Sequence, residues 1–288
     1  MNLYLLAAII SPFIWAFMNV IDKHIVDKRV RNIKVYPLLA GLSVMIYGVI
    51  VSLFLDWNGI SLTDLIFPAL VGVCSGLTLY VYYSAMKESD VSHFTGFIYF
   101  YPVVVALLAF VFLREVIPII GYIGLIIILT GVFLLYKRHS KFSSKKVAYF
   151  ILAIIILTSL QEFFIKVSTS NLPVINAFVI GLIADGIIIS FSLFRKEVRK
   201  GFRKELVNSG WALFAEAFTF LSWLTLYFAM LGLPATIVSA IASIQPLAVL
   251  FFEKIGHKYL GVKDVKLLPK LGAIILIVIG VILLSLSV

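Results

Sequence analysis

The segment YFYPVVVALLAFVFLREV, residues 99–116, decides the fold class. It opens with aromatic residues, contains Pro102, and continues as a long apolar run that ends in two charged residues. Such a run is typical of a helix that crosses a bilayer, which needs about 20 predominantly apolar residues. A similar segment, SIQPLAVLFFEK, recurs at residues 243–254 with Pro246 in the matching place. The two segments indicate a membrane helix that occurs twice in the chain.

The composition extends this interpretation to the whole chain. The 288 residues are 62% hydrophobic and 13% charged, with a mean hydropathy of +1.11, whereas soluble domains are about half apolar and a quarter charged. The net charge of +10 lies in short connections between apolar segments, which is typical of membrane topology and not of a nucleic-acid-binding patch. We therefore expect the protein to lie in the lipid bilayer of the cell membrane and not to bind nucleic acid.

Hydropathy predicts ten spans, each of them helical because backbone groups in lipid must be satisfied within the segment. The fold class is therefore an all-α, multi-pass integral membrane protein. The predicted spans are residues 3–21, 35–55, 65–86, 91–113, 117–136, 147–167, 172–194, 206–231, 235–252 and 267–286.

The two halves of the chain repeat each other. When residues 83–102 are aligned with residues 227–246, Tyr83 falls on Tyr227 and Pro102 on Pro246, and three further segments match in the same order at nearly the same offset. We predict ten transmembrane helices as two five-helix repeats. Because five is odd, the second repeat enters the membrane from the opposite side, as in the inverted repeats of secondary transporters. The predicted repeats are residues 1–139 and 140–288.

The charges indicate an orientation. All but two of the 24 lysines and arginines lie in or close to the odd-numbered connections, and the exceptions are Arg114 and Lys166. The positive-inside rule then places the odd-numbered connections in the cytoplasm and both termini outside.

The motifs resemble those of EamA-type members of the drug/metabolite transporter superfamily. WAFMNVIDK, residues 15–23, is similar to the family's first helix, and the segment from Pro102 through Glu115 to Gly131 resembles its fourth and fifth helices. The resemblance covers residues 3–136 and 147–286, although Tyr259 stands where the family pattern has Glu. It implies a small-molecule carrier whose cavity is lined by spans 1, 3, 4, 6, 8 and 9, and many members are drawn with cytoplasmic termini. We expect no enzymatic activity and no cofactor.

Polar residues in these spans are the candidate site, since a charge at the bilayer centre costs roughly 2.5–3.5 kcal/mol or more. In span eight, Glu216 begins a stripe spaced i, i+3, i+7 and i+11, which lies on one helical face. We predict one cavity with Glu216 and Glu162 as coupling acids. The predicted substrate-binding residues are Trp15, Asn19, Tyr80, Tyr83, Ser92, Thr95, Tyr99, Thr219, Trp223, Tyr227, Ser239 and Ser243.

Each feature also has a structural interpretation. Serine and threonine stripes are common on helix-packing surfaces. Glu162 and Lys166, at i and i+4, are spaced as a neutralising pair, and Asp185 is placed as a structural hydrogen-bond acceptor. Pro102 and Pro246, well inside spans four and nine, are candidate hinges or static bends. Glycines in spans five and ten indicate close packing or a dimer surface, so both a monomer and a homodimer remain open.

The chain lacks a phosphate-binding loop and the common metal-binding spacings, which favours a gradient-driven carrier. We predict an exporter or exchanger of small metabolites, such as amino acids or amphipathic cations, coupled to protons or to exchange. Aromatic residues favour cations, while nearby lysines leave anions open. The alternatives are an intramembrane lipid-modifying enzyme, a channel and a non-transporting scaffold. The repeat partners of Glu162 and Glu216, Asn19 and Gly72, do not form the symmetric polar ring that a channel requires.

Overall fold

The computed structural model describes residues 2–30, 32, 34–88, 97–136, 145–260 and 270–287, and the regular structure of these residues is entirely helical. The helices are α1 (Leu3–Lys28), α2 (Tyr36–Ser52), α3 (Ile66–Glu88), α5 (Tyr101–Leu108) with its π-helical extension η1 (Ala109–Leu113), α6 (Ile119–Tyr136), α7 (Lys145–Asn171), α8 (Val174–Ser190) with the 3₁₀ turn η3 (Phe191–Phe194), α9 (Lys196–Glu205), the 3₁₀ turn η4 (Leu206–Asn208), α10 (Ser209–Gly232), α11 (Ala235–Ala242), α12 (Gln245–Leu260) and α13 (Leu271–Ser285).

Length and composition make several of these helices candidate membrane spans. Within the described residues, five segments are long and apolar enough to cross a bilayer, and five further apolar helices are shorter. Large apolar side chains face outward along them, among them Leu107 at 60% and Phe112 at 67% exposure, as expected for surfaces that contact lipid. The prediction of an all-helical protein with several spans is confirmed, and the arrangement as ten spans in two repeats stays a prediction.

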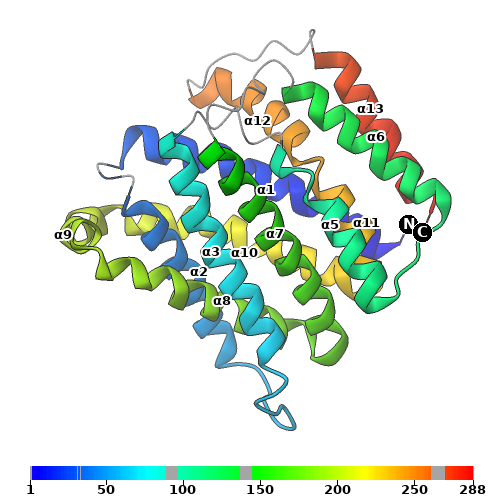
Figure 1. Ribbon diagram of the computed structural model, residues 1–288. Helices are drawn as coiled ribbons and strands as arrows, with labels where there is room; N and C mark the ends of the chain where they lie inside the picture. The colour runs from blue at the N-terminus through cyan, green and yellow to red at the C-terminus, as the bar shows by residue number, and fades with distance from the viewer. Residues whose placement is uncertain are drawn as a thin grey trace.

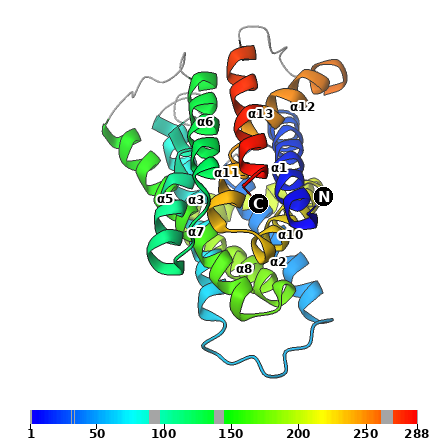
Figure 2. The same cartoon turned by 90° about the vertical axis from the view of Figure 1, so that its right-hand side faces the viewer.

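The helices pack in a recurring pattern (Figure 1). α1 lies along α10 and α3 lies along α7, while α2 and α3 both contact α8. α6 and α13 form a separate pair, and α5 contacts α7 and α11. A quarter turn of the molecule shows α6 and α13 running side by side, and α1 begins on the same side of the bundle on which α13 ends (Figure 2).

Glycines allow the close approach of α6 and α13. A Cβ atom at Gly124 would lie 2.8 Å from the carbonyl oxygen of Gly280, and one at Gly131 would lie 2.9 Å from the carbonyl oxygen of Ala273. The predicted close packing is therefore confirmed at these positions, and it joins two helices of one chain. It is wrong for Gly272, where a Cβ atom would meet nothing within 4 Å.

The prolines begin helices instead of bending them. The predicted span 235–252 is divided into α11 and α12, and Pro246 is the second residue of α12. Pro102 is likewise the second residue of α5, directly after a turn at residues 99–100. First-turn N–H groups have no intrahelical partner, so a proline there loses nothing. The prediction that proline kinks a continuous helix is thus wrong at Pro246, and the hinge role stays a prediction.

α9 is a helix that hydropathy did not predict. It lies between α8 and α10 and is seen nearly end-on at the edge of the bundle in Figure 1. Val198, on its inner side, is only 4% exposed and packs with Val35 and Leu38 of the region that begins α2. Gly201 lies against Val35 and Asn32. This short connection is therefore an ordered part of the fold.

Candidate functional site

The predicted polar face of α10 points into the bundle. Glu216, Thr219, Trp223 and Tyr227 are all buried, with exposures of 8% or less. Among the described residues, no hydrogen-bond partner is found for Thr219 Oγ1, Trp223 Nε1 or the Tyr227 hydroxyl. Buried polar groups are almost always paired. Three unsatisfied donors on one helical face are therefore the chemistry expected of a ligand site.

α1 supplies an aromatic partner to this face. The rings of Trp15 and Trp223 lie with their centroids 6.0 Å apart, so one predicted site residue of span one lies beside one of span eight. Ser11, one turn before Trp15, and Ser222, next to Trp223, each donate a hydroxyl hydrogen bond to the other residue's carbonyl oxygen, at 2.9 and 2.8 Å. These serines serve helix packing. The tryptophans, one of them with an unpaired N–H, are available for other contacts.

Three carboxyl groups come from three neighbouring helices, and we call them the acidic cluster: Asp22 of α1, Asp185 of α8 and Glu216 of α10. The charges of Asp22 and Asp185 act on the Glu216 carboxyl. Asp22 accepts a hydrogen bond from the Tyr36 hydroxyl, whereas Asp185 Oδ1 has no partner among the described residues. Neighbouring buried carboxyls favour binding of a proton or another cation.

Sequence analysis found only part of this cluster. The sequence indicated a structural acceptor role for Asp185 and did not mark Asp22 as a site residue, because nothing in the sequence shows that α1, α8 and α10 converge. The described residues contain no group of three or more histidines, cysteines, aspartates or glutamates that could hold a metal ion. The cluster is an electrostatic site and not a coordination sphere.

Glycines bring α8 close to the site. A Cβ atom at Gly181 would lie 2.7 Å from the Tyr227 hydroxyl, and one at Gly72 of α3 would lie 2.3 Å from the carbonyl oxygen of Gly181. In the repeat predicted from the sequence, Gly72 is the position matched to Glu216. The asymmetry noted in the sequence therefore has a packing reason, because any side chain at this point would push α3 away from α8.

Glu162 of α7 lies in a different environment. It is 5% exposed, and its Oε2 has no partner among the described residues. Its neighbour is Tyr101 of α5, whose carbonyl oxygen accepts a bond from Ser159 at 3.0 Å and whose hydroxyl donates to the carbonyl oxygen of Ser239 at 3.3 Å. Glu162 thus joins α5, α7 and α11 in a second polar region.

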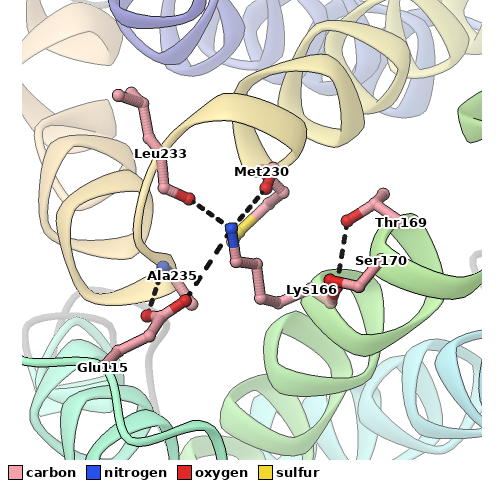
Figure 3. A network of polar contacts seen from close by, with 7 residues as sticks. All are labelled: Glu115, Lys166, Thr169, Ser170, Met230, Leu233 and Ala235. Atoms are coloured by element: carbon pink, nitrogen blue, oxygen red, sulfur yellow. Dashed lines mark hydrogen bonds and ion pairs between the residues drawn. The ribbon is translucent and has the colours of Figure 1, made fainter.

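Lys166 makes a polar network at the end of α7 (Figure 3). Its ammonium group donates to the carbonyl oxygens of Met230 and Leu233, both at 2.8 Å, and lies 3.7 Å from Glu115 Oε1. Glu115 Oε2 in turn accepts the backbone N–H of Ala235 at 2.8 Å. The network therefore caps the end of α10 and the start of α11 with opposite charges, as the helix dipole favours.

This network replaces the pair expected from spacing. The hypothesis that Lys166 neutralises Glu162 is wrong, since the ion-pair partner of Lys166 is Glu115. Burial raises the pKa of the Glu115 carboxyl, against the lowering effect of Lys166 and of the Ala235 N–H. Although Glu115 ends the apolar run of residues 99–116 as a charged residue, its side chain is only 14% exposed.

Several other predicted site residues have structural partners. The hydroxyls of Ser239 and Ser243 bond carbonyl oxygens of their own helical segment, at 3.2 and 2.6 Å, and the Tyr80 hydroxyl donates to Ile189 of α8 at 2.8 Å. These contacts favour the packing interpretation. Asn19 and Tyr99 are partly buried in α1 and ahead of α5, Tyr83 lies in α3, and Ser92 and Thr95 lie outside the described residues.

Fold and interior together define a class: a multi-pass helical membrane protein that keeps polar groups unsatisfied between its helices. Residues 2–137 match the model of the EamA-like transporter family, so the predicted resemblance is confirmed over the first half of the chain. The matched family is one of membrane transporters of the drug/metabolite type. A transporter family is consistent with the predicted lack of enzymatic activity.

Two further comparisons bear on the fold. No curated protein matches the chain. A crystal structure of another protein is similar with a TM-score of 0.72 and 12% sequence identity, over 98% of this chain and 97% of the other. Because identity is so low, this likeness concerns the fold alone, and it extends through both halves of the chain.

Proposed function

We propose that the protein is a secondary transporter that exports or exchanges small cationic or zwitterionic metabolites, such as amino acids or amphipathic cations, by alternating access. The observation that carries this proposal is the acidic cluster beside the α10 face. Carboxyl groups there meet unsatisfied N–H and O–H donors and aromatic rings within a few helical turns. That combination suits a ligand with an amine, a polar end and an apolar body.

The chemistry favours cations over phosphorylated anions. Two aspartates and a glutamate attract positive charge, and the Trp15–Trp223 pair offers ring faces for cation–π contact. Lys166 is one of the lysines for which the sequence allowed an anionic substrate as an alternative. It is engaged by two carbonyl oxygens and Glu115, so this lysine does not favour an anion.

Contacts between helices support the two inverted repeats of residues 1–139 and 140–288. Under the repeat, α1 corresponds to α7 and α3 to α10, so the α1–α10 contact corresponds to the α3–α7 contact, and both are extensive. The repeat relates α6 to α13, so the contact between these two helices is its own counterpart. The approach of Gly124 to Gly280 becomes the approach of Ala273 to Gly131. Such reciprocity is what a pseudo-two-fold axis in the membrane plane produces.

The Lys166 network is the proposed closure at one end of the carrier. It joins the end of η1, through Glu115, to α7 and to the α10–α11 turn, which are elements of both proposed repeats. Alternating access requires contacts that break when the repeats move relative to one another. A single ion pair with three hydrogen bonds at this junction is suited to that role.

Flux measurements on Glu216→Gln test the coupling part of the proposal. Reconstituted protein should lose pH-driven uptake of its substrate, because the amide cannot exchange a proton, while substrate-for-substrate exchange and thermal stability persist. The matched control is Asp56→Asn, which removes an exposed carboxyl outside the helices and should leave flux unchanged. Undiminished pH-driven flux in Glu216→Gln would remove this residue from the mechanism.

Substrate class is tested by thermal shifts of the purified protein with amino acids, polyamines, aromatic cations and sugar phosphates. A ligand at a hundredfold excess over its Kd stabilises the folded state by about 2.7 kcal/mol. We expect amines to stabilise wild type and to lose this effect in Trp223→Ala. Stabilisation by sugar phosphates alone would contradict the proposed substrate class.

A further inference from the structure

The outer side of α9 is a basic surface. Within the segment 195–204, every lysine and arginine is exposed, and the two acids of α9, Glu197 and Glu205, are engaged elsewhere. Glu197 pairs with Lys34 at 2.5 Å, and Glu205 accepts bonds from the Asn32 N–H and the Asn208 side chain, both at 2.8 Å. The exposed basic residues are Arg195, Lys196, Arg199, Lys200, Arg203 and Lys204.

An apolar groove begins where this basic helix ends. Val207, Gly210, Trp211 and Phe214 line a groove of about 430 Å³ at the start of α10. Val207 is 76% exposed and Phe214 is 52% exposed, and a Cβ atom at Gly210 would meet nothing within 4 Å. The groove is therefore open to the outside along its length.

Arg29 and Asn208 connect the groove to the basic surface. The guanidinium of Arg29 lies 4.9 Å above the ring of Trp211. The Asn208 side chain bonds both the Arg29 carbonyl oxygen, at 3.1 Å, and Glu205 at the end of α9. Positive charge, an aromatic ring and an apolar groove are thus held in one continuous patch, which we call the α9–α10 surface.

We propose that the α9–α10 surface binds an anionic phospholipid. The lipid phosphate lies against the arginines and lysines of α9 and against Arg29, and an acyl chain lies in the groove beside Trp211 and Phe214. Charge complementarity selects the occupant, because a polybasic segment next to a membrane helix attracts anionic headgroups. An amphipathic basic helix at the level of the headgroups, followed by a tryptophan, matches interfacial binding. This inference does not depend on the transported substrate.

Native mass spectrometry of the detergent-purified protein tests the proposal. The probes are phosphatidylglycerol and phosphatidylcholine with identical acyl chains, and glycerol 3-phosphate, which offers an anionic phosphate without acyl chains. We expect retention of phosphatidylglycerol at concentrations at least about tenfold lower than those needed for phosphatidylcholine, since each basic residue adds to the attraction. Glycerol 3-phosphate should not be retained.

Two variants separate the groove from the charge. Gly210→Leu fills the groove without changing the charge, and we expect it to weaken phosphatidylglycerol binding about tenfold. Its matched control is Gly272→Leu, because Gly272 is also the second residue of a helix with open space around it, and binding should remain as in wild type. Arg199→Gln combined with Arg203→Gln changes only exposed side chains and should abolish the preference for phosphatidylglycerol.

The proposal is overturned by any of three results. Wild type could retain both lipids equally, glycerol 3-phosphate could bind as well as the lipid, or Gly210→Leu could bind phosphatidylglycerol like Gly272→Leu. A lipid-free dimer that Gly210→Leu disrupts would make the groove an interface between two copies and would also overturn it. If Gly210→Leu does not fold, the arginine variant decides the question alone.

Discussion

Lys166 illustrates how far a residue's neighbours in sequence differ from its neighbours in space. Its i−4 position, Glu162, suggested an ion pair, but its ammonium group reaches the end of α10 and Glu115 instead. Spacing on one helix could predict which face the lysine occupies. It could not predict which helix end would lie opposite, because that depends on the packing of α7 against α10.

The lysine is expected to stabilise this junction. Lys166→Met removes the donor to two carbonyl oxygens and leaves Glu115 without its cation, so the free energy of unfolding should fall by roughly 2–3 kcal/mol. Denaturant or thermal unfolding of the detergent-purified protein measures the change.

The double variant Glu115→Gln with Lys166→Met isolates the pair. It should be less destabilised than the sum of the single variants, because the glutamine no longer leaves a buried charge unpaired and still accepts from Ala235. Strict additivity of the two changes would contradict an interaction between these side chains.

At the scale of helices, hydropathy located the spans and missed their interruptions. Residues 235–252 form a continuous apolar stretch. The helix α11 nevertheless ends before Ser243, and a new helix, α12, begins with Pro246 in its first turn. From sequence alone, a proline that bends one continuous helix cannot be distinguished from a proline in the first turn of a new helix. Hydropathy missed α9 for the opposite reason, because its ten residues are mostly charged and Val198 and Phe202 are its only large apolar residues.

Glycine spacing in spans five and ten did predict close contact, and the contact can be tested. Gly124→Ala places a Cβ atom 2.8 Å from the carbonyl oxygen of Gly280. A backbone atom cannot move aside as a side chain can, so the variant should lose roughly 1–3 kcal/mol of stability.

The control for this variant is Gly272→Ala. Gly272 lies in α13, the same helix pair, but its added Cβ atom meets open space. Its stability should stay within roughly 0.5 kcal/mol of wild type or rise slightly, since alanine is the better helix former. Equal destabilisation by both alanines in thermal unfolding would show that the α6–α13 approach is not tight.

For the molecule as a whole, composition and repeats predicted the class, while convergence of distant helices defined the site. Glu216 and Trp223 could be found because they share a face of one helix. Asp185 could not be assigned to the same site, since it lies on α8 and reaches Glu216 only through the close approach of α8 at Gly72 and Gly181. In the proposed inverted-repeat arrangement, the polar interior is assembled from both halves of the chain.

Orientation in the membrane is a property of the whole molecule and remains to be tested. The charges place the odd-numbered connections in the cytoplasm, whereas many EamA-type transporters are drawn the other way. Cys74 is buried and is the chain's single cysteine, so Cys74→Ala gives a cysteine-free background. Two exposed positions then report on opposite sides of the bundle: Asn58, before α3, and Arg199, on α9.

A membrane-impermeant maleimide should label Asn58→Cys in intact cells and should label Arg199→Cys only after the membrane is permeabilised. The physical reason is that α9 carries the exposed basic residues that the positive-inside rule retains in the cytoplasm. Permeabilised cells serve as the control, since both variants must then react. The reverse pattern would place both termini in the cytoplasm and would move the Lys166 network to the cytoplasmic end, while leaving the helix packing and the acidic cluster as they are.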